Sequence, residues 1–246
     1  MSAFFVSVVV LPTRASALGC GPVLANKLVE VSYVYDGDTV KIAQRQKVRL
    51  AGINTPELDS TNLVISEVAA QATVFTRHWI DQNAPVYLQV AQDAKDNYGR
   101  TLGYLVSGSG EDLGEALIKK GLAYAVTVAP NDEKQQCYAR AETLARKARV
   151  GVWSSKSVVS RALNINSAGF QLITGKITRV FHFKTADAVV IDDSIVLMIK
   201  PKPSMPLRIG RSLEVRGWVN KKRFRYDDFT ALYVLHLNNI ANIKVL

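Results

Sequence analysis

The hydrophobic and polar positions near the start of the chain alternate in short runs. Between Val29 and Leu50 these runs are VEVSYVY, TVKIA and the beginning of KVRLAGI. A two-residue period is typical of half-buried strands, and the Asp36-Gly37 pair between the first two runs is a hairpin signal. The pattern therefore predicts three antiparallel strands.

A helical period follows. From Ser66 to Ile80, apolar residues recur at the spacing of one helix face, as at Val68, Ala72 and Trp79, so we expect an amphipathic helix. The runs PVYLQV and TLGYLV then predict two more strands, joined by the polar loop AQDAKDNYGR.

Two further helices are expected, at residues 113–120 and 132–149. Gly121 would end the first, and Asn131 and Asp132 are the candidates for the N-cap of the second. Five strands with helices inserted after the third and the fifth indicate a small Greek-key barrel of the oligonucleotide- and oligosaccharide-binding (OB) type.

The second half of the sequence has a different pattern. After Trp153 the stretch SSKSVVSRALNINSAG has little apolar periodicity, which favours a linker. Five strand-like runs come next: FQLITGKITRVF, DAVVIDD, SIVLMIKP, SLEVRGWVNKKRF and ALYVLHL. We predict a mainly β fold with α (α+β), with a first domain at residues 28–154, a linker at 155–168 and a second OB-like barrel at 169–246.

Composition narrows the class of protein. The 246 residues are 48% hydrophobic and 21% charged, which excludes a disordered or fibrous chain. The net charge of +10 favours a polyanionic partner, either nucleic acid or an anionic membrane surface. Charge alone does not choose between them.

The first residues, MSAFFVSVVVLPTRASALGCGP, contain an apolar run too short to span a bilayer, followed by a small-x-small site at Ala15 to Ala17. This predicts a cleaved signal peptide at residues 1–17 and an exported protein, periplasmic or secreted, without stable membrane insertion. No Lys or Arg precedes the apolar run, so an ordinary chain terminus is the alternative. Cys20 and Cys137 would form one disulfide in an exported protein, or remain two thiols otherwise.

Candidate chemistry is concentrated in VYDGDTVKIAQRQKVRLAGINTPE, residues 34–57. Hydrolysis of a phosphodiester needs positive charge on the phosphoryl oxygens and a base for the attacking water. Asp38, Asn54 and the carbonyl of Thr55 offer the hard oxygen ligands that a divalent cation prefers.

Three further residues complete this chemistry. Glu57 is the candidate general base. Arg49 and Arg100 are candidates for binding the phosphate, each through two parallel hydrogen bonds.

At this point the sequence resembles the staphylococcal nuclease (thermonuclease) family, through DGDTV at 36–40, VRLAGINTPE at 48–57, DNYGRTLGYL at 96–105, LGEALIKKGLAYA at 113–125 and ARVGVWS at 148–154. The resemblance covers about residues 30–154. It implies a Ca²⁺ ion on Asp38, Asn54 and the backbone carbonyl of Thr55, and Mg²⁺ or Mn²⁺ is the alternative that we leave open. It also implies that Glu57 is the base, that Arg49 and Arg100 bind the phosphate and that Tyr98 lies near the substrate. The reaction implied is hydrolysis of DNA and/or RNA to 3′-phosphate products. Separately from the resemblance, we expect a monomer.

One departure from the family keeps other interpretations open. Asn54 stands where the best-known members carry an aspartate, so one formal negative charge is missing from the metal site. A catalytically inactive nucleic-acid-binding protein on the same barrel is one alternative, and an adaptor for an anionic membrane is another. Taken singly, the acids of DGD are also ordinary turn residues, and Arg49 is an ordinary strand residue.

A basic stretch lies in the second barrel. In VNKKRFRYDDF, the side chains of Lys221, Lys222, Arg223 and Arg225 alternate with aromatic residues. Such a surface is how OB-folds often hold single-stranded nucleic acid, with cations along the phosphates and rings against the bases. The alternative is a charged hairpin tip whose aromatic residues fold into the barrel.

Overall fold

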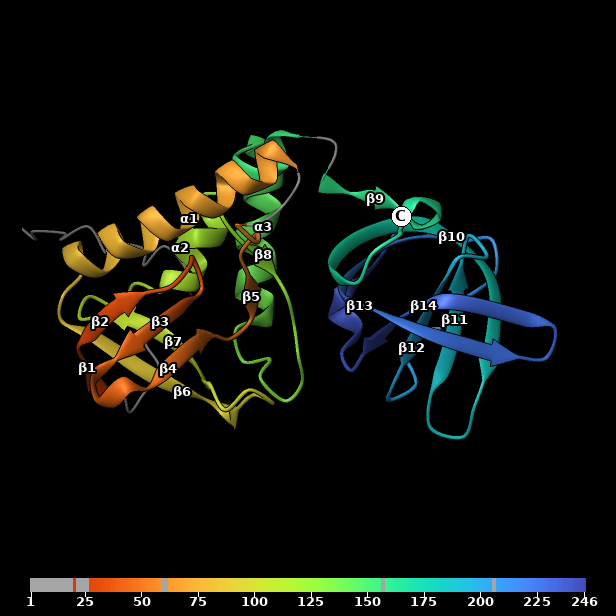
Figure 1. The fold of residues 1–246 in the computed structure, drawn as a ribbon, viewed down its shortest axis with the longest axis horizontal. Coiled ribbons are helices and arrows are strands. Elements are labelled where there is room, and N and C mark those ends of the chain that lie inside the picture. The colour runs from red at the N-terminus through yellow and green to blue at the C-terminus, as the bar shows by residue number, and fades with distance from the viewer. Residues whose placement is uncertain (1–19, 21–26, 59–61, 156–157, 205–206) are drawn as a thin grey trace, which may run out of the picture.

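The computed structural model describes residue 20 and residues 27–58, 62–155, 158–204 and 207–246. The signal peptide predicted for residues 1–17 lies outside this part of the chain. Figure 1 shows two lobes, the first coloured orange to green and the second teal to blue. The described elements are mostly strands, with three α-helices that all belong to the first lobe, which confirms the predicted fold class.

The first lobe is built on a six-stranded sheet in the order β1-β6-β7-β4-β3-β2. Its strands are β1 (Lys27–Val29), β2 (Val31–Val34), β3 (Thr39–Ile42), β4 (Lys47–Leu50), β6 (Val86–Lys95) and β7 (Thr101–Ser107). As predicted, β2, β3 and β4 are antiparallel neighbours, and β6 pairs with β7. The parallel pairing of β4 with β7 brings Arg49 opposite Leu102. The candidate site residues of the segment 34–57 therefore lie beside the loop that precedes β7.

The helices of this lobe are α1 (Leu63–Gln82), α2 (Leu113–Lys119) and α3 (Gln135–Ala148). Helix α1 begins earlier than the apolar period indicates, because the Asn62 side chain accepts hydrogen bonds from the backbone N–H groups of Val64 and Ile65. The predicted cap of α3 is wrong: the helix begins at Gln135, after Lys134, and without a side-chain cap. Asn131 is instead bonded to the backbone of Asp93.

A two-stranded sheet of β5 (Ile53–Asn54) and β8 (Tyr124–Ala125) was not expected from the sequence. Both strands are too short for a period to be visible. The β5–β8 pairing joins the backbone at Ile53 and Asn54 to residues 124–125, which lie in the segment that leads into α3. It therefore fixes the backbone on both sides of Asn54.

The second lobe is a closed barrel. Its strands are β9 (Ser160–Arg161), β10 (Gly169–His182), β11 (Asp187–Ile191), β12 (Ile195–Ile199), β13 (Ser212–Tyr226), β14 (Phe229–Leu237) and β15 (Ile243–Val245). Strand β10 pairs with both β11 and β13, which closes a five-stranded cylinder, with β9 and β15 added to it. The five long runs of the sequence thus form the barrel wall, and its core is filled by branched side chains such as Ile173, Leu197 and Leu235.

The segment predicted as a linker is structured where it is described. Ala162 and Ile165 are buried in the core of the second barrel. Farther along, Leu172 of β10 belongs to the apolar core of the first lobe, and Phe170 packs against it. The two lobes therefore share apolar contacts in addition to the chain that joins them.

Polar contacts also join the lobes. Arg216 of β13 lies 2.6 Å from the Glu142 carboxylate of α3, and Arg146 donates two hydrogen bonds, of 2.9 and 2.8 Å, to Glu214. The Asn242 amide accepts from the N–H of Thr127 and donates to its carbonyl, as a neighbouring strand would. Paired charges that are mostly buried hold a fixed geometry better than exposed ones do. Across the described residues, we find no helix with the length and apolar character needed to cross a bilayer.

Candidate active site

The turn between β2 and β3 carries two carboxylates, Asp36 and Asp38, and packs on helix α1 through Gly37. The Asp36 carboxylate accepts a hydrogen bond from the Asp38 N–H, which is the usual arrangement of an Asx turn. Gly37 allows the close approach: a Cβ there would lie 2.6 Å from the Cβ of Ala72 and 2.7 Å from the Thr55 side chain. The Thr76 hydroxyl of α1 donates to the Gly37 carbonyl and fixes the turn from the other side.

Asp38 is the centre of the site. Its carboxylate is buried, and Oδ2 accepts hydrogen bonds from the backbone N–H of Thr55 at 2.7 Å and from the Thr55 hydroxyl at 2.8 Å. The Arg49 guanidinium lies 3.0 Å from the same oxygen. Residues separated by many positions in sequence are thus drawn onto one carboxylate.

Arg49 organises the loop that follows β4. Its Nη1 donates to the carbonyls of Leu50 and Ile53, and its Nη2 donates to Oδ1 of Asn54 at 2.9 Å. Because a guanidinium has no acceptor, it fixes which atom of the Asn54 amide is oxygen. The Asn54 Nδ2 then donates to the carbonyl of Thr55 at 3.1 Å. Asp38, Arg49, Asn54 and Thr55, which the sequence singled out for separate roles, therefore form one hydrogen-bonded network.

The loop between β6 and β7 carries Tyr98 and Arg100. Arg100 Nε donates to Asp96 Oδ2 at 2.6 Å, and the guanidinium lies 5.5 Å from the centre of the Tyr98 ring, which is 86% exposed. Burial alone would raise the pKa of Asp96, but hydrogen bonds from Arg100 and Tyr98 outweigh it and hold that pKa below its usual value. Asp96 was not singled out from the sequence, although it begins the DNYGR motif.

Glu57 is exposed and lies on the wall of an open groove of about 700 Å³ that Asn54 also lines. The groove continues along the second lobe, past Ser160 and Asn164. The candidate base thus shares a solvent-filled space with the Asn54 end of the network. Arg100 is held by Asp96 in the structure and is not part of the network around Asp38.

Comparison with known proteins decides the family. Residues 47–155 match the family described as "Staphylococcal nuclease homologue". The thermonuclease of Staphylococcus hyicus is 35% identical over 129 residues, which cover 51% of this chain and 75% of that protein. The chain belongs to the staphylococcal nuclease family.

Two other relatives agree with this assignment. The thermonuclease of Staphylococcus intermedius is 36% identical over 126 residues, 50% of this chain and 74% of the relative. Endonuclease YhcR of Bacillus subtilis strain 168 is 27% identical over 135 residues, 50% of this chain but 11% of the relative. The family match contains Arg49, Asn54, Glu57 and Arg100, whereas the second barrel lies beyond it.

The family resemblance implies a divalent cation, and the oxygen atoms of the network fit one. The Asp38 carboxylate and the side-chain oxygen of Asn54 both contact the Arg49 guanidinium. The backbone carbonyl of Thr55 accepts a hydrogen bond from the Asn54 side chain. All three are hard oxygen donors. They supply one formal negative charge, however, and the positive charge of Arg49 faces two of them. We therefore expect these three ligands to bind a divalent cation more weakly than a site with two carboxylates would.

Asp36 adds to the charge near this network. Burial, followed by the negative charge of Asp38, raises the pKa of Asp36 to about 6. A cation close to both carboxylates would lower that pKa, since it favours their ionised forms.

The basic stretch of the second barrel lies at one end of β13 and the turn that follows. The side chains of Lys221, Lys222, Arg223 and Arg225 are all exposed. Behind them, Phe181 contacts the rings of Phe224, Tyr226 and Phe229 with centroid distances of 6.2, 5.0 and 6.2 Å. Phe229 is buried, whereas Tyr226 is 40% exposed, so one ring of the cluster remains available to a ligand.

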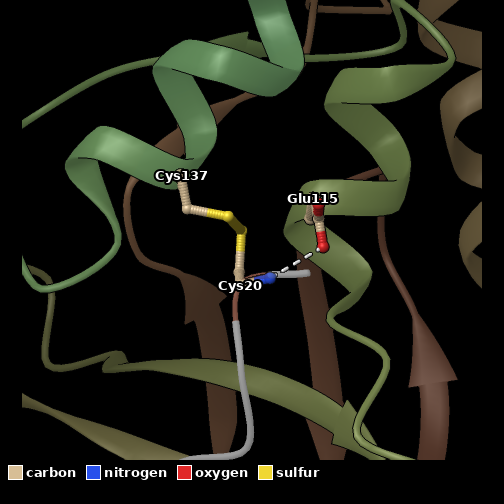
Figure 2. Close-up of side chains that lie close together, drawn as sticks. All are labelled: Cys20, Glu115 and Cys137. Carbon is tan, nitrogen blue, oxygen red and sulfur yellow. Dashed lines mark hydrogen bonds between the residues drawn. A yellow bond between two sulfur atoms is a disulfide. The ribbon is translucent and has the colours of Figure 1, made fainter. Parts of the chain in front are cut away.

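The two cysteines form a disulfide, Cys20–Cys137, with their Cα atoms 5.5 Å apart. Figure 2 shows it joining Cys20 to α3, with the Cys20 N–H donating to the Glu115 carboxylate at 3.1 Å. Within the described part of the chain, these three residues are the group of His, Cys, Asp or Glu side chains close enough to share a metal. Because the two sulfurs are bonded to each other, the group serves as a tether between the start of the chain and α3.

Proposed function

We propose that this protein is an exported nuclease that uses a divalent cation to hydrolyse the phosphodiester bonds of DNA and/or RNA, leaving 3′-phosphate products. Ca²⁺ is the ion that we expect, with Mg²⁺ or Mn²⁺ as substitutes. The proposal is supported by membership of the staphylococcal nuclease family and by relatives named thermonuclease and endonuclease. The disulfide agrees with export.

The observation that carries the proposal is the network of Asp38, Arg49, Asn54 and Thr55 beside Glu57. Arg49 is held by two backbone carbonyls and by Asn54, so its guanidinium is already oriented before a substrate arrives. Preorganised charge of this kind is the largest single contribution to many hydrolytic reactions, because no reorganisation is needed when charge develops. A binding protein alone would not need this arrangement next to an exposed carboxylate.

The residues then have separate tasks. Asp38, Asn54 and Thr55 would hold the cation, which when bound supplies positive charge to the phosphoryl oxygens. Glu57 takes a proton from the attacking water while the oxygen of that water forms a bond to phosphorus. The bond from phosphorus to the 5′-oxygen breaks, and that oxygen receives a proton from solvent. Arg49 and Arg100 stabilise the negative charge on the phosphate, and Arg100 must first exchange its contact with Asp96 for the substrate.

We assign the second barrel to substrate binding. Lys221, Lys222, Arg223 and Arg225 are exposed beside a partly exposed aromatic cluster, which matches single-strand binding surfaces in character. Tyr98, exposed next to Arg100, would contact the substrate near the scissile phosphate. We further propose that the enzyme acts as a monomer.

One observation favours a second candidate, an inactive nucleic-acid-binding protein. The side-chain Nδ2 of Asn54 donates a hydrogen bond to the Thr55 carbonyl that a cation would need, and Asn54 brings no charge. If metal binding were lost altogether, the basic surfaces would remain. This candidate predicts retention of nucleic acid in a gel without cleavage.

The roles are tested by the turnover of plasmid DNA and single-stranded RNA with Ca²⁺. We expect Glu57→Gln and Arg100→Ala to lower turnover by about 100-fold or more. Glu67→Gln on α1 and Arg140→Ala on α3 change the same charges at exposed positions away from the network and serve as matched controls. A DNA polymerase should be unable to extend the DNA products of the unsubstituted protein until a phosphatase removes their 3′-phosphate. Turnover near that of the unsubstituted protein in both variants would contradict the assignment.

A further inference from the structure

A second cavity opens beside Arg49, on the side where the lobes meet. It has a volume of about 190 Å³, and its lining includes Arg49, Asp93, Asp96, Val126 and Val128 of the first lobe and Trp218 of the second. A hollow of this size accommodates a flat ring system of the size of a nucleobase rather than a larger ligand. The second barrel, which lies outside the family match, thus contributes a side chain next to the candidate active site.

The position of Trp218 follows from the alternation of β13. Leu213, Val215 and Val219 point into the barrel core, so Glu214, Arg216 and Trp218 point outward. The first two of these are held by Arg146 and Glu142 of α3. Trp218 is the next outward residue in that row, so the same ion pairs that join the lobes place the indole at the cavity.

The indole is supported on one side and open on the other. Phe170, its cross-strand neighbour, meets it edge-to-face with ring centroids 5.4 Å apart. Even so, Trp218 remains 42% exposed, whereas Trp79 and Trp153 are buried. A large aromatic ring that is braced by a neighbour and left open toward a cavity is the usual form of a stacking platform.

The charges of the cavity determine which part of a nucleotide it accepts. Asp93 and Asp96 line it, so acceptors for the amino and imino groups of a base are present. Arg49 lies at the same cavity and also reaches Asp38. A nucleotide can therefore direct its base into the cavity and its phosphate toward the arginines.

From these observations we infer that Trp218 forms a subsite for an unpaired nucleobase next to the scissile phosphate, so that the second barrel completes the substrate-binding site. The inference rests on the proposed nuclease function. A base that is paired in a duplex is not free to stack on the indole, so the subsite also predicts a preference for single strands.

The test is equilibrium binding of a single-stranded oligonucleotide, measured by fluorescence anisotropy in the Glu57→Gln full-length protein so that the strand stays intact. We expect an added Trp218→Ala substitution to raise Kd by about 10-fold, and Trp218→Phe to restore most of the affinity because a ring remains. An oligonucleotide with abasic sites should bind with equal affinity to the Glu57→Gln parent and to its Trp218→Ala derivative. Tyr33→Ala, which removes an exposed ring from β2, is the matched control, and thermal melting checks that each variant folds.

The outcomes separate this inference from the proposed function. If Trp218→Ala binds the base-containing strand within twofold of its parent, or loses equal affinity for the abasic strand, the subsite is wrong whether or not the protein is a nuclease. If the unsubstituted protein fails to cleave while the binding difference is present, the proposed function fails and the subsite stands.

Discussion

At the scale of single residues, the proposed cation site depends most on Asn54. Its carbonyl oxygen is fixed by Arg49, and its N–H is bonded to the Thr55 carbonyl. The motifs of the sequence singled out Asp38, Asn54 and Thr55 as one set of ligands, although Asp38 and Thr55 are 17 positions apart. That the Asn54 amide uses one of the expected ligand oxygens required the structure, since no pattern reports the orientation of an amide.

We predict that Asn54→Asp binds Ca²⁺ about 10-fold more tightly, because a second carboxylate raises the charge of the ligand set and cannot donate to Thr55. Isothermal titration calorimetry with Ca²⁺ measures this directly. Gln82→Glu, at the exposed end of α1, adds the same charge elsewhere and should leave the affinity unchanged. Equal affinities in the Asn54→Asp and unsubstituted proteins would rule out these oxygens as ligands.

At the scale of elements, the turn between β2 and β3 links the site to helix α1. The hydrogen bond from Thr76 and the close packing of Gly37 on Ala72 and Thr55 place Asp38 against the loop that contains Asn54. A displacement of this turn would therefore change the site as well as the packing.

We predict that Gly37→Ala destabilises the fold by about 1–3 kcal/mol, since the added methyl group overlaps two side chains and the turn must move away from α1. Thermal melting measures the loss. Gly108→Ala is the control, because its added Cβ would have no neighbour nearer than 3.5 Å. If both variants melt at the same temperature, Gly37 does not hold the turn.

The same scale shows where sequence patterns succeed and fail. The long strands and α1 have enough residues for their period to be visible, so their type was predictable. The strands β5 and β8 have two residues each and form because tertiary contacts bring them together. Asn131, a reasonable N-cap by composition, is instead used by the backbone of Asp93, which is distant in sequence. Trp218 likewise reaches the cavity beside Arg49 from a part of the chain that is distant in sequence.

At the scale of the whole molecule, the two lobes are joined by a cluster of ion pairs. Burial alone would raise the pKa of Glu214, but hydrogen bonds and charges from Arg146, then Arg216 and Lys244, outweigh it and hold that pKa below its usual value. A carboxylate with a lowered pKa contributes stability that is complete above its ordinary pKa of 4.5 and is lost as the pH falls through the lowered value.

We predict that Glu214→Gln lowers stability by about 2 kcal/mol at pH 7, because the guanidinium groups of Arg146 and Arg216 each lose one carboxylate partner and keep only Glu142. The difference in stability between the variant and the unsubstituted protein should shrink as the pH falls well below 4.5, where Glu214 becomes protonated in both the folded and the unfolded protein. Thermal melting from pH 7 to pH 3 follows this change. A difference that stays constant over that range would show that the charge of Glu214 does not join the lobes.

The measurement that tests the central claim most directly is digestion of supercoiled plasmid and single-stranded RNA by the chain from residue 18 onward. Ca²⁺, Mg²⁺, Mn²⁺ and excess chelator are compared, with the Glu57→Gln variant beside each. The account predicts cleavage that needs a divalent cation and is lost in the variant. If neither protein cleaves with any ion while both retard nucleic acid in a gel, the account is contradicted and the protein is a binding module.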